Sequence, residues 1–202
     1  MTSARAFDEI VGEIRGILTR AQIVVEEVPA PQKLAPFAFA MTADVLSRVP
    51  SAADGSVADD ADEDDDIATA RFVLLHDPAG QEGWMGKYRC VTFVRSAIDA
   101  DMANDPLLAN IGWSWFIEAL AQLDCTYLAP SGTITRVASA SFGSLDERAD
   151  SCELEIRASW TPLEDGNIAD HARAWLALLE QCAGLPPIPK GVAELHRSPI
   201  AK

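Results

Sequence analysis

The stretch CELEIRASW, residues 152–160, decides the fold class, because apolar and polar residues alternate along it. The apolar members are Cys152, Leu154, Ile156, Ala158 and Trp160, and the polar members are Glu153, Glu155, Arg157 and Ser159. Successive side chains of a strand point to opposite faces, so this stretch predicts a strand with one dry face and one wet face. Such strands are typical of antiparallel sheets that pack one face on a core.

Five other stretches predict strands, at residues 23–28, 37–46, 69–76, 85–98 and 133–142. The turn-forming sequence DPAG, residues 77–80, separates the third of these from the fourth. In stretch 85–98 we expect the even-numbered Tyr88, Cys90, Thr92 and Val94 on one face, and Lys87, Arg89, Val91 and Phe93 on the other.

Three stretches predict helices. Apolar residues recur at spacings of three and four over about residues 4–19. Asp105 and Pro106 are favourable first residues for a largely buried helix that runs to about residue 123. Asn167, with Asp170 three residues on, resembles a capping box for a final helix that Gly184 terminates. We therefore predict one α+β domain over residues 1–190, in the order α-β-β-β-β-α-β-β-α. Its helices pack mainly on one face of a single antiparallel sheet of about six strands.

The chain is acidic, with a formal net charge of −15. Eight of its acids lie in residues 51–66, which we expect to form a flexible loop, and residues 191–202 are expected to be a loosely ordered tail. A net negative charge repels phosphate backbones, so no nucleic-acid partner is predicted.

Other features of the chain predict where it resides. It holds no apolar run long enough to span a membrane, and residues 1–10 do not resemble a signal peptide. The four cysteines form no CxxC pair and are expected to be buried free thiols, as in a cytoplasmic protein.

Several segments together are similar to those of one known family. They are PAPQKLAPFAFAMTADV at residues 29–45, RFVLLHDP at 71–78, DPLL and WSW within 105–115, GTITRVASASFG at 132–143, ASWTP at 158–162 and QCAGLPP at 181–187. The chain resembles the actinobacterial family grouped as domain of unknown function three thousand. That resemblance implies a bacterial cytoplasmic protein, and it implies no activity and no site residue. The element order also looks like that of the bacterial secretion-chaperone fold with one extra strand, a likeness of topology alone.

No motif predicts a catalytic residue, a cofactor or a metal. A strained serine elbow of the GxSxG type is missing, and His76, His171 and His196 do not fall at metal-ligand spacing. The alternating acids from Asp60 to Asp66 lack the glycine that a calcium loop of the EF-hand type needs, so a solvated charge run is the better interpretation.

Strand alternation predicts a basic face on the wet side of the sheet. It would gather Arg71, Lys87, Arg89, Arg95 and Arg157. Such a face could receive an anionic peptide or a small acid. Alternatively, the same cations could form cross-strand ion pairs with Glu153 and Glu155.

The helix from residue 105 holds two tryptophans, Trp113 and Trp115, which are separated by about 200° around its axis. One of them should therefore point away from the main core. It could line a groove or a dimer contact, or it could pack under a loop.

Two hypotheses of function follow. The first is a non-enzymatic cytoplasmic interaction or adaptor module, which binds a protein partner or a second copy of itself. The second is a domain that binds a small anion, or acts as an enzyme, in a pocket between the sheet and the helices. There Arg71, Lys87 or Arg89 would hold the ligand and His76 would be the acid–base group. Under either hypothesis, Arg89→Glu should abolish binding of an anion.

Overall fold

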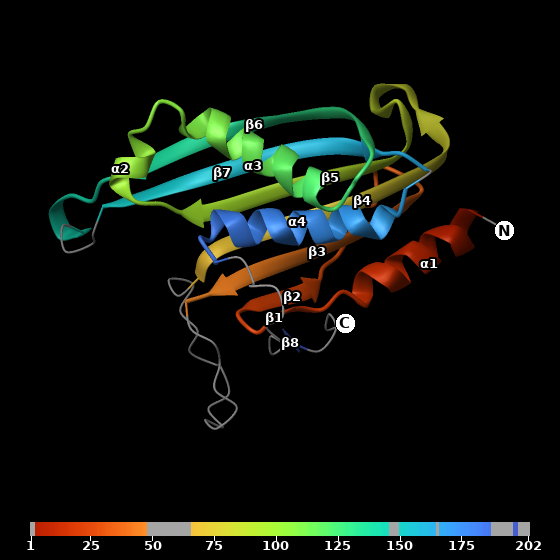
Figure 1. Cartoon of the computed structure of the whole chain (residues 1–202), viewed down its shortest axis with the longest axis horizontal. Coiled ribbons are helices and arrows are strands. Elements are labelled where there is room, and N and C mark those ends of the chain that lie inside the picture. The colour runs from red at the N-terminus through yellow and green to blue at the C-terminus, as the bar shows by residue number, and fades with distance from the viewer. Residues whose placement is uncertain (1–2, 48–65, 146–149, 165, 187–195, 198–202) are drawn as a thin grey trace.

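A computed structural model describes residues 3–47, 66–145, 150–164, 166–186 and 196–197. One antiparallel sheet of six strands forms the back layer, and the three long helices lie across one of its faces (Figure 1). The predicted α+β class with a single antiparallel sheet is therefore confirmed. The expected acidic loop lies outside the described residues except for Asp66, as does the tail except for residues 196–197.

The strands lie in the order β2-β3-β4-β5-β7-β6, and every neighbouring pair is antiparallel. Their bounds are β2 Ile23–Glu27, β3 Phe37–Leu46, β4 Asp66–Gln81, β5 Gly86–Ala97, β6 Tyr127–Ser139 and β7 Ser151–Pro162. Two further short strands, β1 (Thr19–Arg20) and β8 (His196–Arg197), pair with each other outside the main sheet.

Strands β4 and β6 are longer than the sequence predicts. Strand β4 continues through the expected turn at residues 77–80, because its register with β5 shifts between His76 and Gln81 and absorbs the extra residues as an irregularity. Strand β6 begins six residues before the expected start and contains a similar shift between Leu128 and Ser131. Such bulges let a strand stay in the sheet where its local sequence suggests a turn.

The helices are α1 (Ser3–Arg15), the short α2 (Ala100–Ala103), α3 (Leu108–Gln122) and α4 (Ile168–Cys182). Helix α1 ends before the predicted residue 19, because Gly16 follows it and glycine is a poor helix former. Helix α3 begins three residues later than predicted. The carboxylate of Asp105 accepts a hydrogen bond from the Leu107 amide, which makes a turn before the helix. Helix α4 starts as predicted, with Asn167 accepting from the Ala169 amide.

The sheet has an inner face, which the helices cover, and an outer face on the opposite side. The largest fully buried side chains of the core lie between the inner face and the helices, and they include Phe72, Phe116, Trp160 and Trp175. Burying side chains of this size stabilises a fold by about 1.5–3 kcal/mol each. These side chains fill the space in which the second hypothesis placed a pocket.

Candidate functional site: the outer face of the sheet

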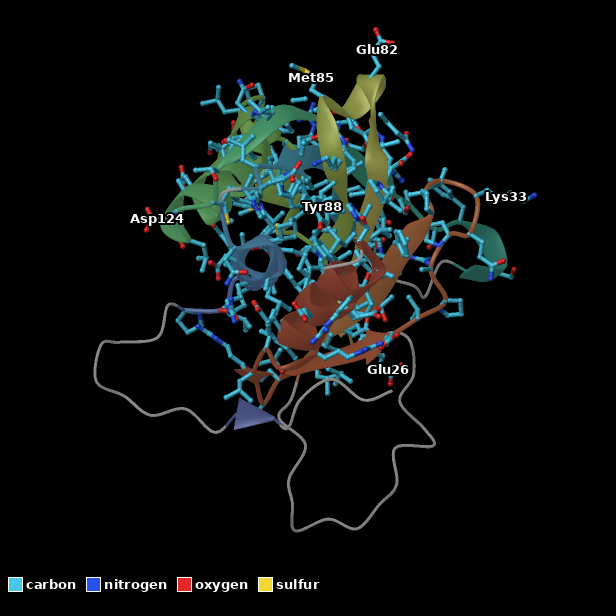
Figure 2. The ribbon with its side chains drawn as sticks, turned by 90° about the vertical axis from the view of Figure 1, so that its right-hand side faces the viewer. Glu26, Lys33, Glu82, Met85, Tyr88 and Asp124 are labelled. Carbon is cyan, nitrogen blue, oxygen red and sulfur yellow. The ribbon has the colours of Figure 1, made fainter. Side chains whose placement is uncertain are left out.

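The register of the strands places all five predicted cations on the outer face. Arg71 lies opposite Phe93, and Phe93 lies opposite Arg157, so these three side chains form a row across β4, β5 and β7. Lys87, Arg89 and Arg95 follow on the same face because they differ from Phe93 by even numbers of residues. Figure 2 views the molecule along α4, and Lys33 and Asp124 lie on opposite sides of the molecule in this view. The loop that carries Lys33 contacts the outer face, because Arg71 donates a hydrogen bond to the Pro29 carbonyl of that loop.

Arg89 occupies the covered end of the outer face. Its side chain is 8% exposed, and its guanidinium donates four hydrogen bonds of 2.6–3.1 Å. The acceptors are the Ala129 carbonyl and the hydroxyls of Thr161, Ser131 and Ser159. All four are neutral, and within the described part of the chain no carboxylate lies within ion-pair distance of Arg89. Burial lowers the pKa of Arg89, but an arginine retains its charge at neutral pH.

The uncompensated charge of Arg89 is unusual, because a buried charge is normally paired with an opposite one. The three hydroxyls that hold it belong to β6 and β7 and share its face. The sequence could have predicted two of these hydroxyls. Ser159 and Thr161 lie two and four residues after Arg157 on the same strand, and residues at even spacing share a face. The contribution of Ala129 could not have been found, because its carbonyl is presented by the irregular part of β6, where Ala129 has a φ of 47°.

Of the remaining cations, Arg71, Arg95 and Arg157 lie at the open end of the face, and Lys87 lies beyond Arg89 on β5. The Arg157 guanidinium lies 2.7 Å from the Glu155 carboxylate and 4.9 Å from the centre of the Phe93 ring. Arg95 is 4.0 Å from Glu153. The pair of Arg95 and Glu153 joins β5 to β7, as the alternative interpretation predicts, whereas Arg157 and Glu155 pair within β7 itself. Surface pairs of this kind contribute about 0–1 kcal/mol, so they can exchange partners at little cost.

The other two cations differ in their partners. Lys87 pairs with Glu164 at 3.2 Å, near the start of α4. Arg71 is exposed and donates only to a backbone carbonyl, that of Pro29, among the described residues. Arg71 is therefore the cation of this face most able to accept a new anionic partner.

A groove of about 480 Å³ lies between the two ends of the outer face. It is mainly apolar, and the residues that line it include Val73, Val91, Phe93, Ser159, Arg71 and Arg157. Ser159 joins the groove to Arg89, because its hydroxyl accepts a hydrogen bond of 2.6 Å from that guanidinium. The groove thus offers apolar surface with cations on both sides of it.

His76 and Trp113 lie on the inner side of the sheet and do not join the basic face. His76 is 4% exposed and stacks on Tyr88, with ring centres 4.2 Å apart, while Phe7 and Phe37 lie within 6 Å of it. Burial lowers the pKa of His76, which favours a neutral ring in this aromatic cluster. Tyr88 is itself buried, and its label lies near the centre of the view in Figure 2.

Trp113 packs between α3 and β6. Its ring centre is 5.0 Å from that of Phe116, and its Cζ3 atom lies 2.9 Å from the position that a Cβ on Gly132 would occupy. Glycine at residue 132 is therefore what allows the indole to approach the strand. Both Trp113 and Trp115 are half-buried against the core, so neither is directed fully into solvent.

Acidic residues gather at the other limit of the outer face. Asp44 lies opposite Thr69, which lies opposite Arg95, and a cavity of about 560 Å³ there is lined by Asp44, Asp66, Arg71 and Arg95 among others. Burial, together with the charges of Asp66 and Glu26, raises the pKa of Asp44 to about 6. The carboxylates at this end of the face would repel an anion, whereas none of the acidic residues that the structure describes lines the groove.

Three of the cysteines, Cys90, Cys125 and Cys182, lack the lowered pKa of a nucleophile. All four are free thiols, and burial raises the pKa of Cys125 to about 11 and of Cys182 to about 12. A nucleophilic cysteine needs the opposite shift. Over the residues that the structure describes, no cluster of three potential metal ligands occurs. None of the described helices has the length and apolar character needed to span a bilayer.

The chain belongs to the family described as Protein of unknown function (DUF3000), whose model matches residues 3–193. This result confirms the family resemblance and assigns no activity. No curated protein and no solved structure matches the chain, so the likeness to secretion chaperones stays a prediction.

Proposed function

We propose that this chain is a non-enzymatic interaction module, whose groove binds an acidic segment of a partner protein. The observation that carries the proposal is Arg89, a buried cation held by neutral oxygens beside the groove. A carboxylate in the groove near Ser159 would supply the missing negative charge, and Arg71 could pair with a second one at the exposed side.

The apolar part of the groove defines the rest of the partner segment. Val73, Val91 and Phe93 offer a surface for an aliphatic side chain. A segment in which acidic and aliphatic residues alternate would therefore complement both the cations and the apolar floor. The net charge of −15 opposes such a partner at long range, but salt screens that repulsion beyond about 8 Å, so the local arginines dominate at contact.

The free thiols and the groove volume support two further proposals, on the location of the protein and on the size of its ligand. Four free thiols support a cytoplasmic location, since disulfides are rare in a reducing compartment. A small amphipathic carboxylate is the second candidate ligand. The groove volume of about 480 Å³ favours it, because small-molecule sites fall in the same range.

The test is fluorescence anisotropy with a labelled short peptide of alternating Leu and Glu, compared with a matched peptide of Leu and Gln. We expect the acidic peptide to bind, and Arg71→Glu to weaken it by roughly tenfold or more. Arg5→Glu is the matched control, because Arg5 is an exposed cation on α1 whose ion pair is with Glu9. It should leave the affinity unchanged.

Two results would overturn the peptide proposal. Equal binding of the Leu–Gln peptide would show that the cations take no part. Binding of octanoate in a calorimetric titration, with neither peptide binding, would assign the groove to small carboxylates instead.

A further inference from the structure

Strand β6 is the outermost strand on one side of the sheet, and its far edge faces away from β7 (Figure 1). Over residues 132–139 it pairs with β7 in unbroken register, from Gly132 opposite Ala158 to Ser139 opposite Ser151. Within the described part of the chain, no other strand pairs with β6. Alternate backbone N–H and C=O groups along this edge are therefore directed outward, as in any edge strand.

The usual protections of an edge strand cover only the beginning of β6. Pro130 and the register shift between Leu128 and Ser131 disrupt pairing there. Beyond them the strand is regular, and its one charged residue is Arg136. That guanidinium donates to the carbonyls of Ala103 and Asp105 and so lies over the chain around α2.

The charge of this edge points to a second copy of the chain as its partner. The protein carries 31 acids, yet residues 125–145 contain none. Two copies with a net charge of −15 each would repel one another over most of their surfaces. An approach through β6 brings together two acid-free segments and keeps the acidic ones apart.

We infer that two copies of the chain pair antiparallel through the edges of β6, which joins their sheets into one. A two-fold axis perpendicular to the sheet would keep the outer faces of both copies on the same side. With the axis at Thr135, that residue would lie opposite its own copy and Thr133 would lie opposite Val137, and cross-strand pairs of such β-branched residues stabilise a sheet. Because Thr133 also lines the groove, the two grooves would lie on one surface near the axis.

The first test is sedimentation velocity of the full chain over a roughly hundredfold range of concentration, since dimer formation follows mass action. We expect a species of twice the 21.7 kDa chain mass. The variant Thr135→Lys/Val137→Lys should sediment as the single chain at concentrations where the wild type is dimeric, because it sets like charges against each other across the axis.

The matched control is Thr42→Lys/Thr69→Lys, which adds the same charges to the outer face on β3 and β4. It should remain dimeric. Thermal unfolding of each variant separates a lost dimer from a lost fold. A second measurement needs no variant: amide exchange over residues 132–139 should slow as concentration rises, while exchange in β2 should not.

A wild type that sediments as a single chain throughout would overturn the inference, as would a β6 variant that dimerises as tightly as its control. Neither result would bear on peptide binding in the groove, because Thr135 and Val137 do not line it.

Discussion

The inner and outer faces of the sheet come from alternate residues of the same strands, and they differ in the kind of side chain that each one buries. On the inner face, Phe72 and Trp160 are closed off by α3 and α4 and every large side chain packs on another. On the outer face, Arg89 is a charged residue with only 8% of its surface exposed, and it is held by hydrogen bonds to neutral oxygens. The comparison shows that the inner face buries apolar side chains against the helices, while the outer face buries a charged side chain among neutral oxygens.

The largest difference between the two faces should be in the free energy of unfolding, when two adjacent residues of β4 are each replaced by alanine. Phe72→Ala removes a fully buried ring from the inner face and should cost about 3–5 kcal/mol of the free energy of unfolding. Val73→Ala, on the outer face, should cost less than about 1 kcal/mol, because the groove already exposes that side chain in part. Urea denaturation of the two variants measures both values. Equal losses would mean that the outer face is as closed as the inner one.

The pH response of the inner face should follow His171. Burial lowers its pKa to about 4, and its Nδ1 atom accepts a hydrogen bond from the Trp160 indole. The unfolded chain therefore binds a proton at His171 more readily than the folded chain does. The stability that the neutral His171 contributes is fully present above pH 6.5 and is lost as the pH falls towards about 4. The loss should be about 3 kcal/mol.

The variant His171→Gln tests this origin of the acid sensitivity. A glutamine can accept the indole hydrogen bond but does not titrate. The stability of the variant should therefore depend less on pH between 6.5 and about 4 than that of the wild type, even if the variant is less stable at neutral pH. A slope that equals that of the wild type would exclude His171 as its source.

Arg89 should matter to stability more than its neighbours on the outer face. Arg89→Ala leaves three hydroxyls and one carbonyl without their donor and should cost about 2 kcal/mol. Arg71→Ala should change stability by less than about 0.5 kcal/mol, because Arg71 is exposed. Thermal and urea unfolding of the pair supply the comparison. A stable Arg89→Ala protein would show that the network is dispensable, contrary to the arrangement described above.

The outer face should show the opposite pH response to the inner one. Asp44 has a pKa raised to about 6, so the folded chain binds its proton more readily than the unfolded chain does. Its ionisation reduces stability as the pH rises from about 4 to about 6. Asp44→Asn should therefore stabilise the protein by about 1 kcal/mol above pH 6, a value that allows for solvent screening of this half-buried group. Below pH 4 the difference should vanish, and a gain that persists there would have another cause.

The smallest expected effect is on the affinity for the acidic peptide, when the ion pair of Arg157 and Glu155 is removed. Glu155→Gln removes the carboxylate that competes for Arg157 and should strengthen binding of the acidic peptide by roughly threefold, with little change in stability. Glu9→Gln, which removes a carboxylate from an exposed pair on α1, is its control. A weaker peptide complex in Glu155→Gln would place the ligand away from Arg157.

Much of this arrangement could be predicted from parity along the strands. Two-residue alternation placed Arg71, Arg89 and Arg157 on one face, because an antiparallel ladder preserves side-chain direction across neighbouring strands. The same rule separates Arg71 from His76, since these two residues of one strand have opposite parity. The sequence therefore already contains the information that separates His76 from the basic face.

Other features depended on contacts that no local pattern contains. The bulge at residues 128–131 brings the Ala129 carbonyl to Arg89, and the sequence there suggested a loop before the strand. The position of Trp113 beside Gly132 joins two elements that are far apart along the chain. The expected start of α3 was wrong for a local reason, because Asp105 caps a turn instead of the helix itself.

The sequence by itself determined the fold class, the face on which each strand residue lies and the acidic character of the chain, because these follow from alternation, helical periodicity and composition. Only the tertiary structure decided that Arg89 is buried among neutral oxygens, that the groove opens on the uncovered face and that β6 ends the sheet. Those features depend on which strands become neighbours and how far each extends, and the free energy of distant contacts fixes that order.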